Sequence, residues 1–142
     1  MGEHAEIKLI QRLSPLQEGM LFQHMLDHNY NAYFEQMRFK LEGPLNLEAL
    51  QKSLNLLIDR YDILRSVFMY EDLDEPIQIV LKQRSTTIHY EDISSLPDAE
   101  KRNQVEAFCQ QDKAKGFDLS SDLLTRMAVL KTGEATYQVI WI

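Results

Sequence analysis

Apolar residues recur at two different spacings along the chain, and each spacing predicts a different element. Between Asn46 and Tyr61 they repeat every three or four positions with charged residues between them, the pattern of an amphipathic helix that Asn46 can cap. From 32 to 42 the later apolar and charged side chains alternate instead. This segment is therefore predicted to be a half-buried strand, which ends at Gly43 and Pro44.

Two further helices are indicated by the residues at their ends. Ser14 is a candidate N-cap, with Pro15 at the first helical position and Gln17 placed for a capping box. The apolar residues that follow predict a broad and deeply buried helix face. Another helix is expected from about 98 to 115, where acidic residues begin the segment and Gly116 stops it.

Short strands are expected in the remaining segments, at 66–70, 76–82, 87–91, 124–131 and 136–142. The first two are expected to form a hairpin around an acidic turn at 72–75. Helices and strands mixed in this way predict an α/β fold, built as an α+β sandwich.

Composition restricts the class of protein. The chain has 142 residues, 44% of them hydrophobic, which suits one folded domain rather than a disordered segment. A net charge of -7 argues against a nucleic-acid partner or an anionic membrane surface. No apolar run is long enough to span a bilayer, and no signal peptide is visible. The single cysteine, Cys109, fits a reducing compartment, so a cytoplasmic location is expected.

Three stretches carry a family resemblance. The first is 13–22, which contains Ser-Pro-Leu-Gln-Glu-Gly-Met-Leu-Phe, and the second is 60–68. The third, 117–126, contains Phe-Asp-Leu, with Leu123 where the family pattern has a proline. In this order and spacing they resemble the signature motifs of condensation domains of nonribosomal peptide synthetases.

The resemblance implies a fold and an activity. The fold would be like that of chloramphenicol acetyltransferase, with two related lobes and the active site in a tunnel between them. In this interpretation 1–12 is an N-terminal leader with the first strand, and 13–142 is an incomplete N-terminal lobe. Enzymes of this family form an amide bond between a donor acyl or peptidyl thioester and an acceptor aminoacyl thioester. Both substrates are carried on the phosphopantetheine of peptidyl carrier proteins, so no cofactor or metal is expected to bind directly.

The resemblance also assigns roles to residues. The catalytic motif of the family, His-His-x-x-x-Asp-Gly, is expected just beyond Ile142, so the chain holds no catalytic residue and is expected to be inactive alone. Whether it acts as an enzyme therefore depends on its parent. Arg65 is implied as structural support of the active site, because the family pairs this arginine with the aspartate of the histidine motif. Without that aspartate the guanidinium would be an orphaned charge, unless solvent or another acid reaches it.

Other interpretations of the same features stay open. Arg65 could be only a cation at a helix end. The chain could be a non-catalytic interaction half that complements a separate C-terminal chain, contacts adjacent synthetase domains or docks a carrier protein. The segment 140–142 is apolar on both faces of its strand, so we expect an uncovered surface there, with marginal stability or self-association.

The remaining chemical candidates favour structural roles. His24 and His28 lie four positions apart on a predicted helix, but the pattern supplies no third metal ligand, and a solvated face is the preferred interpretation. His89 is interpreted as a partly exposed strand residue. Cys109 is interpreted as a small buried hydrophobe rather than a nucleophile. The acidic segment 71–75 lacks the glycine and the last glutamate of a calcium loop, so it is interpreted as a solvated turn.

Overall fold

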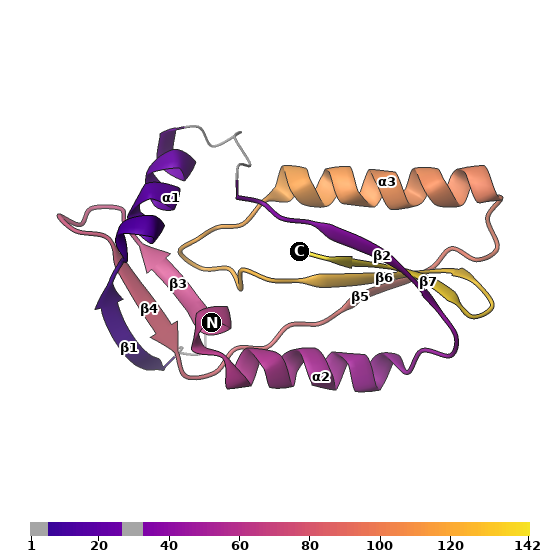
Figure 1. Cartoon of the computed structure of the whole chain (residues 1–142), viewed down its shortest axis with the longest axis horizontal. Helices are drawn as coiled ribbons and strands as arrows, with labels where there is room; N and C mark the ends of the chain where they lie inside the picture. Colours follow the sequence, from indigo (N-terminus) through magenta and orange to yellow (C-terminus); the bar gives the residue numbers. More distant parts are fainter. Residues whose placement is uncertain (1–5, 27–32) are drawn as a thin grey trace, which may run out of the picture. The chain divides into compact units, whose positions relative to one another are not determined.

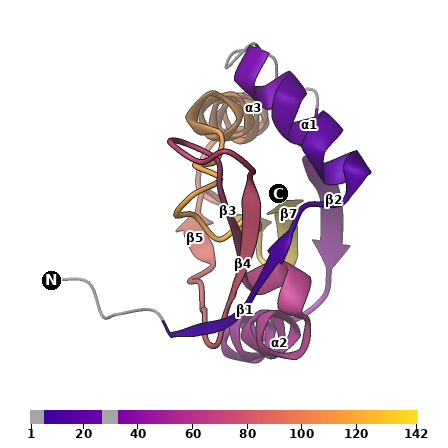
Figure 2. The same cartoon turned by 90° about the vertical axis from the view of Figure 1, so that its left-hand side faces the viewer.

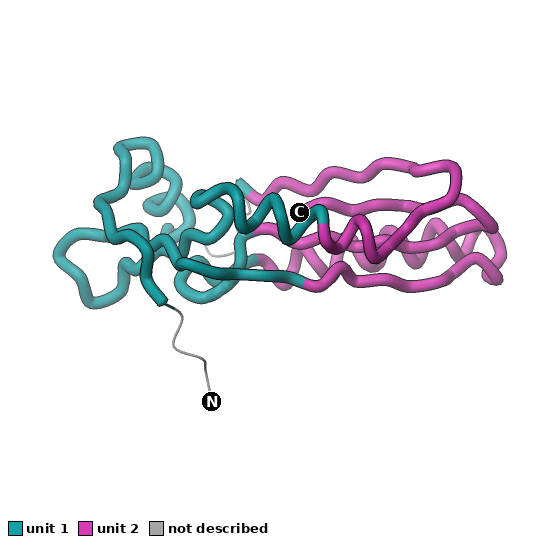
Figure 3. Tube along the Cα trace, turned by 90° about the horizontal axis from the view of Figure 1, so that it is seen from below, with its two compact units in different colours: residues 1–33, 53–86, 117–124 teal, residues 34–52, 87–116, 125–142 magenta. Residues whose placement is uncertain are grey.

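The computed structural model describes residues 6–26 and 33–142, and these residues form two compact units (Figure 3). Each unit is assembled from three separate segments of the chain. The segments of unit 1 are Met1–Tyr33, Ser53–Thr86 and Phe117–Leu124. The segments of unit 2 are Phe34–Lys52, Thr87–Gly116 and Thr125–Ile142. Each unit has its own sheet, and the mixed α/β class predicted from the sequence is confirmed.

Unit 1 contains a three-stranded antiparallel sheet in the order β1-β4-β3 (Figure 2). Its strands are β1 (Ile7–Arg12), β3 (Ser66–Met69) and β4 (Ile77–Leu81). The predicted hairpin is confirmed, because β3 pairs antiparallel with β4 across the acidic turn. A short 3₁₀ helix, η1 (Asp62–Arg65), leads directly into β3.

The first helix, α1 (Pro15–Leu26), begins where the sequence predicts it. The capping box is formed: the backbone N–H of Ser14 donates to Oε1 of Gln17 at 2.8 Å, and the N–H of Gln17 donates to Oγ of Ser14 at 3.3 Å. The prediction of a deeply buried face is wrong, because Leu21 is the helix's one buried residue and Phe22 is 58% exposed. Periodicity identifies the apolar face of a helix, but it does not show whether another element covers that face.

Unit 2 contains a four-stranded sheet in the order β2-β7-β6-β5. The strands are β2 (Met37–Glu42), β5 (His89–Asp92), β6 (Met127–Gly133) and β7 (Thr136–Trp141). The pairs β2–β7 and β6–β7 are antiparallel, whereas β5 pairs parallel with β6.

Some predicted strand limits were wrong. The strand predicted over 32–42 begins only at Met37, because its pairing partner β7 supplies just six residues, and position 32 lies outside the described residues. The strand predicted over 124–131 begins at Met127 and continues to Gly133. Alternation shows which residues can extend, but the length of the neighbouring strand decides how many of them pair.

The two longer helices begin and end close to their sequence signals (Figure 1). Helix α2 (Leu47–Arg60) is capped by Asn46, whose Oδ1 accepts the N–H of Ala49 at 2.9 Å. Helix α3 (Asp98–Lys115) stops at Gly116, which has a φ of 61°. A residue with positive φ at this position is the usual reason for glycine after a helix.

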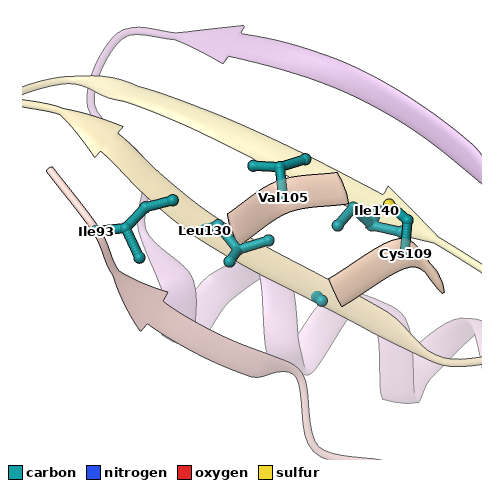
Figure 4. Packing of buried hydrophobic residues seen from close by; sticks show 6 residues of the cluster. Ile93, Val105, Cys109, Leu130 and Ile140 are labelled. Carbon is teal, nitrogen blue, oxygen red and sulfur yellow. The ribbon is translucent and has the colours of Figure 1, made fainter. Parts of the chain in front are cut away.

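The core of unit 2 lies where α3 packs on its sheet (Figure 4). The buried cluster consists of Ile93, Val105, Cys109, Ala128, Leu130 and Ile140. This packing corrects the prediction of an uncovered surface at 140–142. Ile140 is fully buried, and Ile142, which is partly buried, packs against the same cluster, because α3 supplies the cover that the sequence pattern could not locate.

Candidate functional site

Arg65 lies at the junction of α2, η1 and β3, and its side chain is only 4% exposed. Its Nη1 donates to the backbone oxygens of Ile58, at 2.6 Å, and of Asp59. Its Nε donates to the oxygen of Leu81 at 3.0 Å, and its Nη2 donates to Oδ1 of Asp62. A guanidinium has five N–H donors, and these four hydrogen bonds use four of them.

Another acid does reach the Arg65 guanidinium, so the exception allowed for in the sequence analysis applies here. Asp62 supplies a carboxylate within its own motif, and the last turn of α2 supplies carbonyl groups that a helix leaves without internal partners. A cation at this position also interacts favourably with the negative end of the helix dipole. The structure thus places the Arg65 guanidinium at the end of α2, while its pairing with a further aspartate remains a prediction.

Asp62 is more exposed than Arg65, and it also binds Lys8 on β1. Nζ of Lys8 lies 2.8 Å from both carboxylate oxygens. The hydrogen bond from Lys8, with the nearby charges of Lys8 and Arg65, holds the pKa of Asp62 below its usual value. The Asp62 carboxylate therefore keeps its charge to a lower pH than an unperturbed aspartate does.

A second network joins the first two signature motifs through a residue that belongs to neither. Gln78 on β4 is 3% exposed, and its Nε2 donates to Oγ of Ser66 at 2.7 Å. Its Oε1 accepts from Nε2 of Gln11 at 2.9 Å and from Nε2 of Gln17 at 3.2 Å. Oγ of Ser66 in turn donates to the backbone oxygen of Asp62 at 3.1 Å. One buried amide therefore connects β1, α1, β3 and η1.

Sequence reasoning missed Gln78, although one signal was present. It is the only polar residue of the strand segment Ile77–Leu81, on a strand that pairs on both sides. A buried amide is costly unless its donors and acceptors find partners, so a lone glutamine in a central strand indicates a polar network. The network also gives the hydroxyl of Ser66 two partners, the Gln78 amide and the backbone oxygen of Asp62.

The third motif begins with a turn built around Asp118. Its carboxylate accepts the N–H of Ser120 at 2.9 Å and the hydroxyl groups of Ser120 and Ser121 at 2.6 and 2.7 Å. These bonds, led by the Ser120 hydroxyl, lower the pKa of Asp118. The backbone N–H of Asp118 donates to Oδ2 of Asp122 at 2.9 Å, which closes the turn.

The same motif ends at Arg126, which holds the carboxyl end of α3 in unit 2. Its Nε donates to Oδ1 of Asp112 at 2.6 Å, and its Nη2 donates to the backbone oxygen of Asp112 at 3.0 Å. Its Nη1 donates to the oxygen of Gly116 at 2.8 Å. Arg126 thus binds the carboxyl end of α3, as Arg65 binds the carboxyl end of α2. Each arginine is the residue immediately before a strand, β6 for Arg126 and β3 for Arg65.

The other chemical candidates lie in ordinary packing environments. Cys109 is buried in the core of unit 2, as predicted. His89 is exposed and stacks on Phe108, with ring centroids 5.1 Å apart. His24 is half-buried, and His28 lies outside the described residues. Within 6–26 and 33–142, no group of three or more metal-binding side chains is present, and no helix is both long and apolar enough to cross a bilayer.

Unit 2 also has an open groove of about 690 Å³, lined by β2, α3, β6 and β7. Two of its cations pair with acids of the same groove: Arg38 binds Glu106 at 2.8 Å, and Lys101 lies 3.4 Å from Asp98. The Glu106 hydrogen bond raises the pKa of Arg38, and the hydrogen bonds from Gln110 and Arg38 lower that of Glu106. Charge pairs within the groove thus account for Arg38 and Lys101.

Comparisons with known proteins assign these motifs to a family. The family model described as "Condensation domain" matches residues 8–142. A plipastatin synthase subunit of Bacillus subtilis (strain 168) is 48% identical over 141 residues, which is 99% of this chain and 6% of that protein. Gramicidin S synthase 2 of Brevibacillus brevis is 45% identical over 130 residues, covering 92% of this chain and 3% of that protein. The chain thus spans only a few per cent of the length of these relatives.

Solved structures show the same fold at lower sequence identity. The starter condensation domain of rhizomide synthetase matches with a TM-score of 0.81 at 20% identity, covering 94% of this chain and 33% of that one. A four-domain nonribosomal peptide synthetase bound to AMP and glycine matches with a TM-score of 0.78 at 20% identity, over 96% of this chain and 10% of that one.

Proposed function

Because the chain belongs to the condensation-domain family, we propose that it forms the N-terminal lobe of a domain that makes amide bonds in a nonribosomal peptide synthetase. The proposal is carried by one observation: the first two signature motifs meet in the buried network around Gln78. The residues of these two motifs are therefore not only present in order but belong to one connected hydrogen-bond network in unit 1.

The reaction of the parent would join a donor acyl or peptidyl thioester to the amine of an acceptor aminoacyl thioester. We propose that both are delivered on phosphopantetheine arms by peptidyl carrier proteins, and that adjacent synthetase domains in the cytoplasm are its other partners. The nitrogen attacks the thioester carbonyl, the carbon–sulfur bond breaks, and the donor arm leaves as a thiol. This chain's part is to form a scaffold, since its networks bring together amide, hydroxyl and carbonyl groups.

The catalytic histidine pair would come from outside these 142 residues. The four histidines of the chain, at positions 4, 24, 28 and 89, do not include an adjacent pair. The remaining N–H of Arg65 is the group that would reach the aspartate of the histidine motif. In this arrangement Asp62 and the end of α2 hold the guanidinium in place, and the motif aspartate takes the fifth donor.

The test is amide formation by a purified module that contains this sequence, supplied with two loaded carrier proteins and followed by mass spectrometry of the carrier-bound product. We expect the module to form the dipeptidyl or acyl-aminoacyl product and the 142-residue chain to form none. Absence of product from the module, with both carriers shown to be loaded, would overturn the proposed function. Product formed by the 142-residue chain alone would overturn its role as a scaffold.

A second candidate function is that of a non-catalytic interaction half, which self-associates, complements a separate C-terminal chain or docks a carrier protein. The observation that favours it is the uncovered apolar face of α1, where Leu16 is 73% and Leu26 is 63% exposed. Large exposed apolar patches often mark contact surfaces. Sedimentation velocity tests the self-association of this chain. Self-association predicts a larger species whose amount rises with protein concentration and falls in Leu16→Glu. A monomer at all concentrations would exclude self-association.

A further inference from the structure

The carboxyl end of β7 is held more firmly than its pairing in the sheet requires. The N–H of Ile142 donates to the backbone oxygen of Arg126 at 2.9 Å, and the oxygen of Ile142 accepts the N–H of Arg126 at 3.0 Å. That same oxygen also accepts the hydroxyl of Thr125 at 2.9 Å. The backbone N–H of Ile142 therefore has one hydrogen-bond partner, and its backbone oxygen has two.

The Thr125 hydroxyl has a second partner. Nε1 of Trp141 donates to Oγ1 of Thr125 at 2.9 Å, and Thr125 is 6% exposed. One buried hydroxyl thus donates to the backbone of Ile142 and accepts from the side chain of the residue before it. The direction of the backbone and the orientation of the indole are set by the same atom.

The Thr125 contact is connected to helix α3 as well as to the hairpin of β6 and β7. The residue after Thr125 is Arg126, whose guanidinium binds both the carboxylate and the backbone of Asp112 and the oxygen of Gly116. Side chains of Arg126 and Asp112 are 18% and 8% exposed, so solvent competes little with this pair. The start of the segment leading into β6 is therefore anchored to the end of a helix, and the end of β7 is anchored to that segment.

The opposite end of the same hairpin provides a contrast. There the hydroxyl of Thr132 donates to the backbone oxygen of Thr136 at 3.3 Å, and both residues are only half-buried. The same strand pair thus has a threonine-to-carbonyl bond at each end, but only the Thr125 end adds a third partner and a link to the helix.

We propose that Thr125 is a positioning residue for the condensation reaction, because it fixes the direction in which the chain continues from β7 toward the histidine motif. The inference rests on the proposed function, in which that motif follows Ile142. A catalytic group displaced by about 1 Å can lose on the order of 100-fold in rate. The Thr125 hydroxyl binds both the backbone of Ile142 and the side chain of Trp141, so its loss is expected to cause such a displacement.

The experiment uses the synthetase module that contains this sequence, with Thr125→Val, Thr125→Ser and the matched control Thr132→Val. Valine keeps the shape of threonine and removes one hydroxyl in each case, so both variants lose a hydroxyl-to-carbonyl bond at one end of the hairpin. We expect Thr125→Val to lower kcat about ten-fold or more with KM unchanged. Thr125→Ser should retain activity, and Thr132→Val should keep both constants.

A second measurement follows the contact without using activity. Trp141 is the only tryptophan of the 142-residue chain, so in that chain the fluorescence reports on the surroundings of this indole, which include its hydrogen bond to Thr125. We expect Thr125→Val to shift its emission and Thr132→Val to leave it unchanged. Equal kcat values for Thr125→Val and Thr132→Val in an active module would overturn the inference and leave the proposed function standing. A wild-type module with loaded carriers and no product would overturn both.

Discussion

Replacing Arg65 by methionine tests whether the buried guanidinium holds unit 1 together. Methionine fills a similar volume without a charge, so the change removes the hydrogen bonds and little of the packing. The backbone oxygens of Ile58, Asp59 and Leu81 would lose their Arg65 donor, and two of them belong to the last turn of α2. Carbonyl groups in that turn have no partner within the helix.

The expected cost follows from these contacts. Each of the three bonds to a carbonyl contributes about 1 kcal/mol net, so their loss costs about 3 kcal/mol. The pair with Asp62 adds little to this, because the Asp62 side chain is 44% exposed and water can solvate it when the arginine is gone. Arg65→Met should therefore lower the free energy of unfolding by about 3 kcal/mol.

Urea denaturation followed by far-UV circular dichroism measures this change. The matched control is Asp62→Asn, which removes the exposed pairs to Arg65 and Lys8 but leaves the carbonyl bonds, so it should cost clearly less than Arg65→Met. Arg65→Lys should recover only part of the loss, because one ammonium cannot reach all three carbonyls. A cost below about 1 kcal/mol for Arg65→Met would refute the reasoning, and so would equal costs for Arg65→Met and Asp62→Asn.

Three further predictions concern the other networks. Ser66→Thr should be tolerated, whereas Ser66→Val should cost about 1 to 3 kcal/mol in urea denaturation, since it leaves the buried Gln78 amide without its acceptor; equal costs for both variants would contradict the network. The pKa of Asp118 is lowered in the folded state, so its stabilising contribution is present above the ordinary carboxyl pKa and is lost as pH falls through the lowered value. Ser120→Ala should raise the pKa of Asp118 in an NMR titration. An unchanged titration would rule out the Ser120 hydrogen bonds as the cause of the lowered pKa. Cys109 should react with a thiol reagent only after unfolding, and fast labelling of the native chain would show that it is not buried between α3 and the sheet.

The local sequence determined the features that depend on neighbours along the chain. The capping box of Ser14 and Gln17, the Asn46 cap and the glycine stop at Gly116 are all present as predicted, because caps use groups within four residues of each other. The family was also predictable, since its motifs are short segments read in order. The hairpin of β3 and β4 was predictable for the same reason, because its two strands are separated by one turn.

Only the tertiary structure decided which apolar faces are covered and which polar groups meet. Helix α1 and the segment 140–142 have similar apolar character in sequence, yet α1 is largely exposed, whereas Ile140 is fully buried in the cluster that α3 forms with its own sheet. Likewise, the sequence did not show which groups bind the Arg65 guanidinium in this chain. Its carbonyl partners Ile58 and Leu81 lie 7 and 16 positions away and come together with it only when helix and sheet have formed. Burial and long-range hydrogen bonds depend on this packing, which no local pattern of residues encodes.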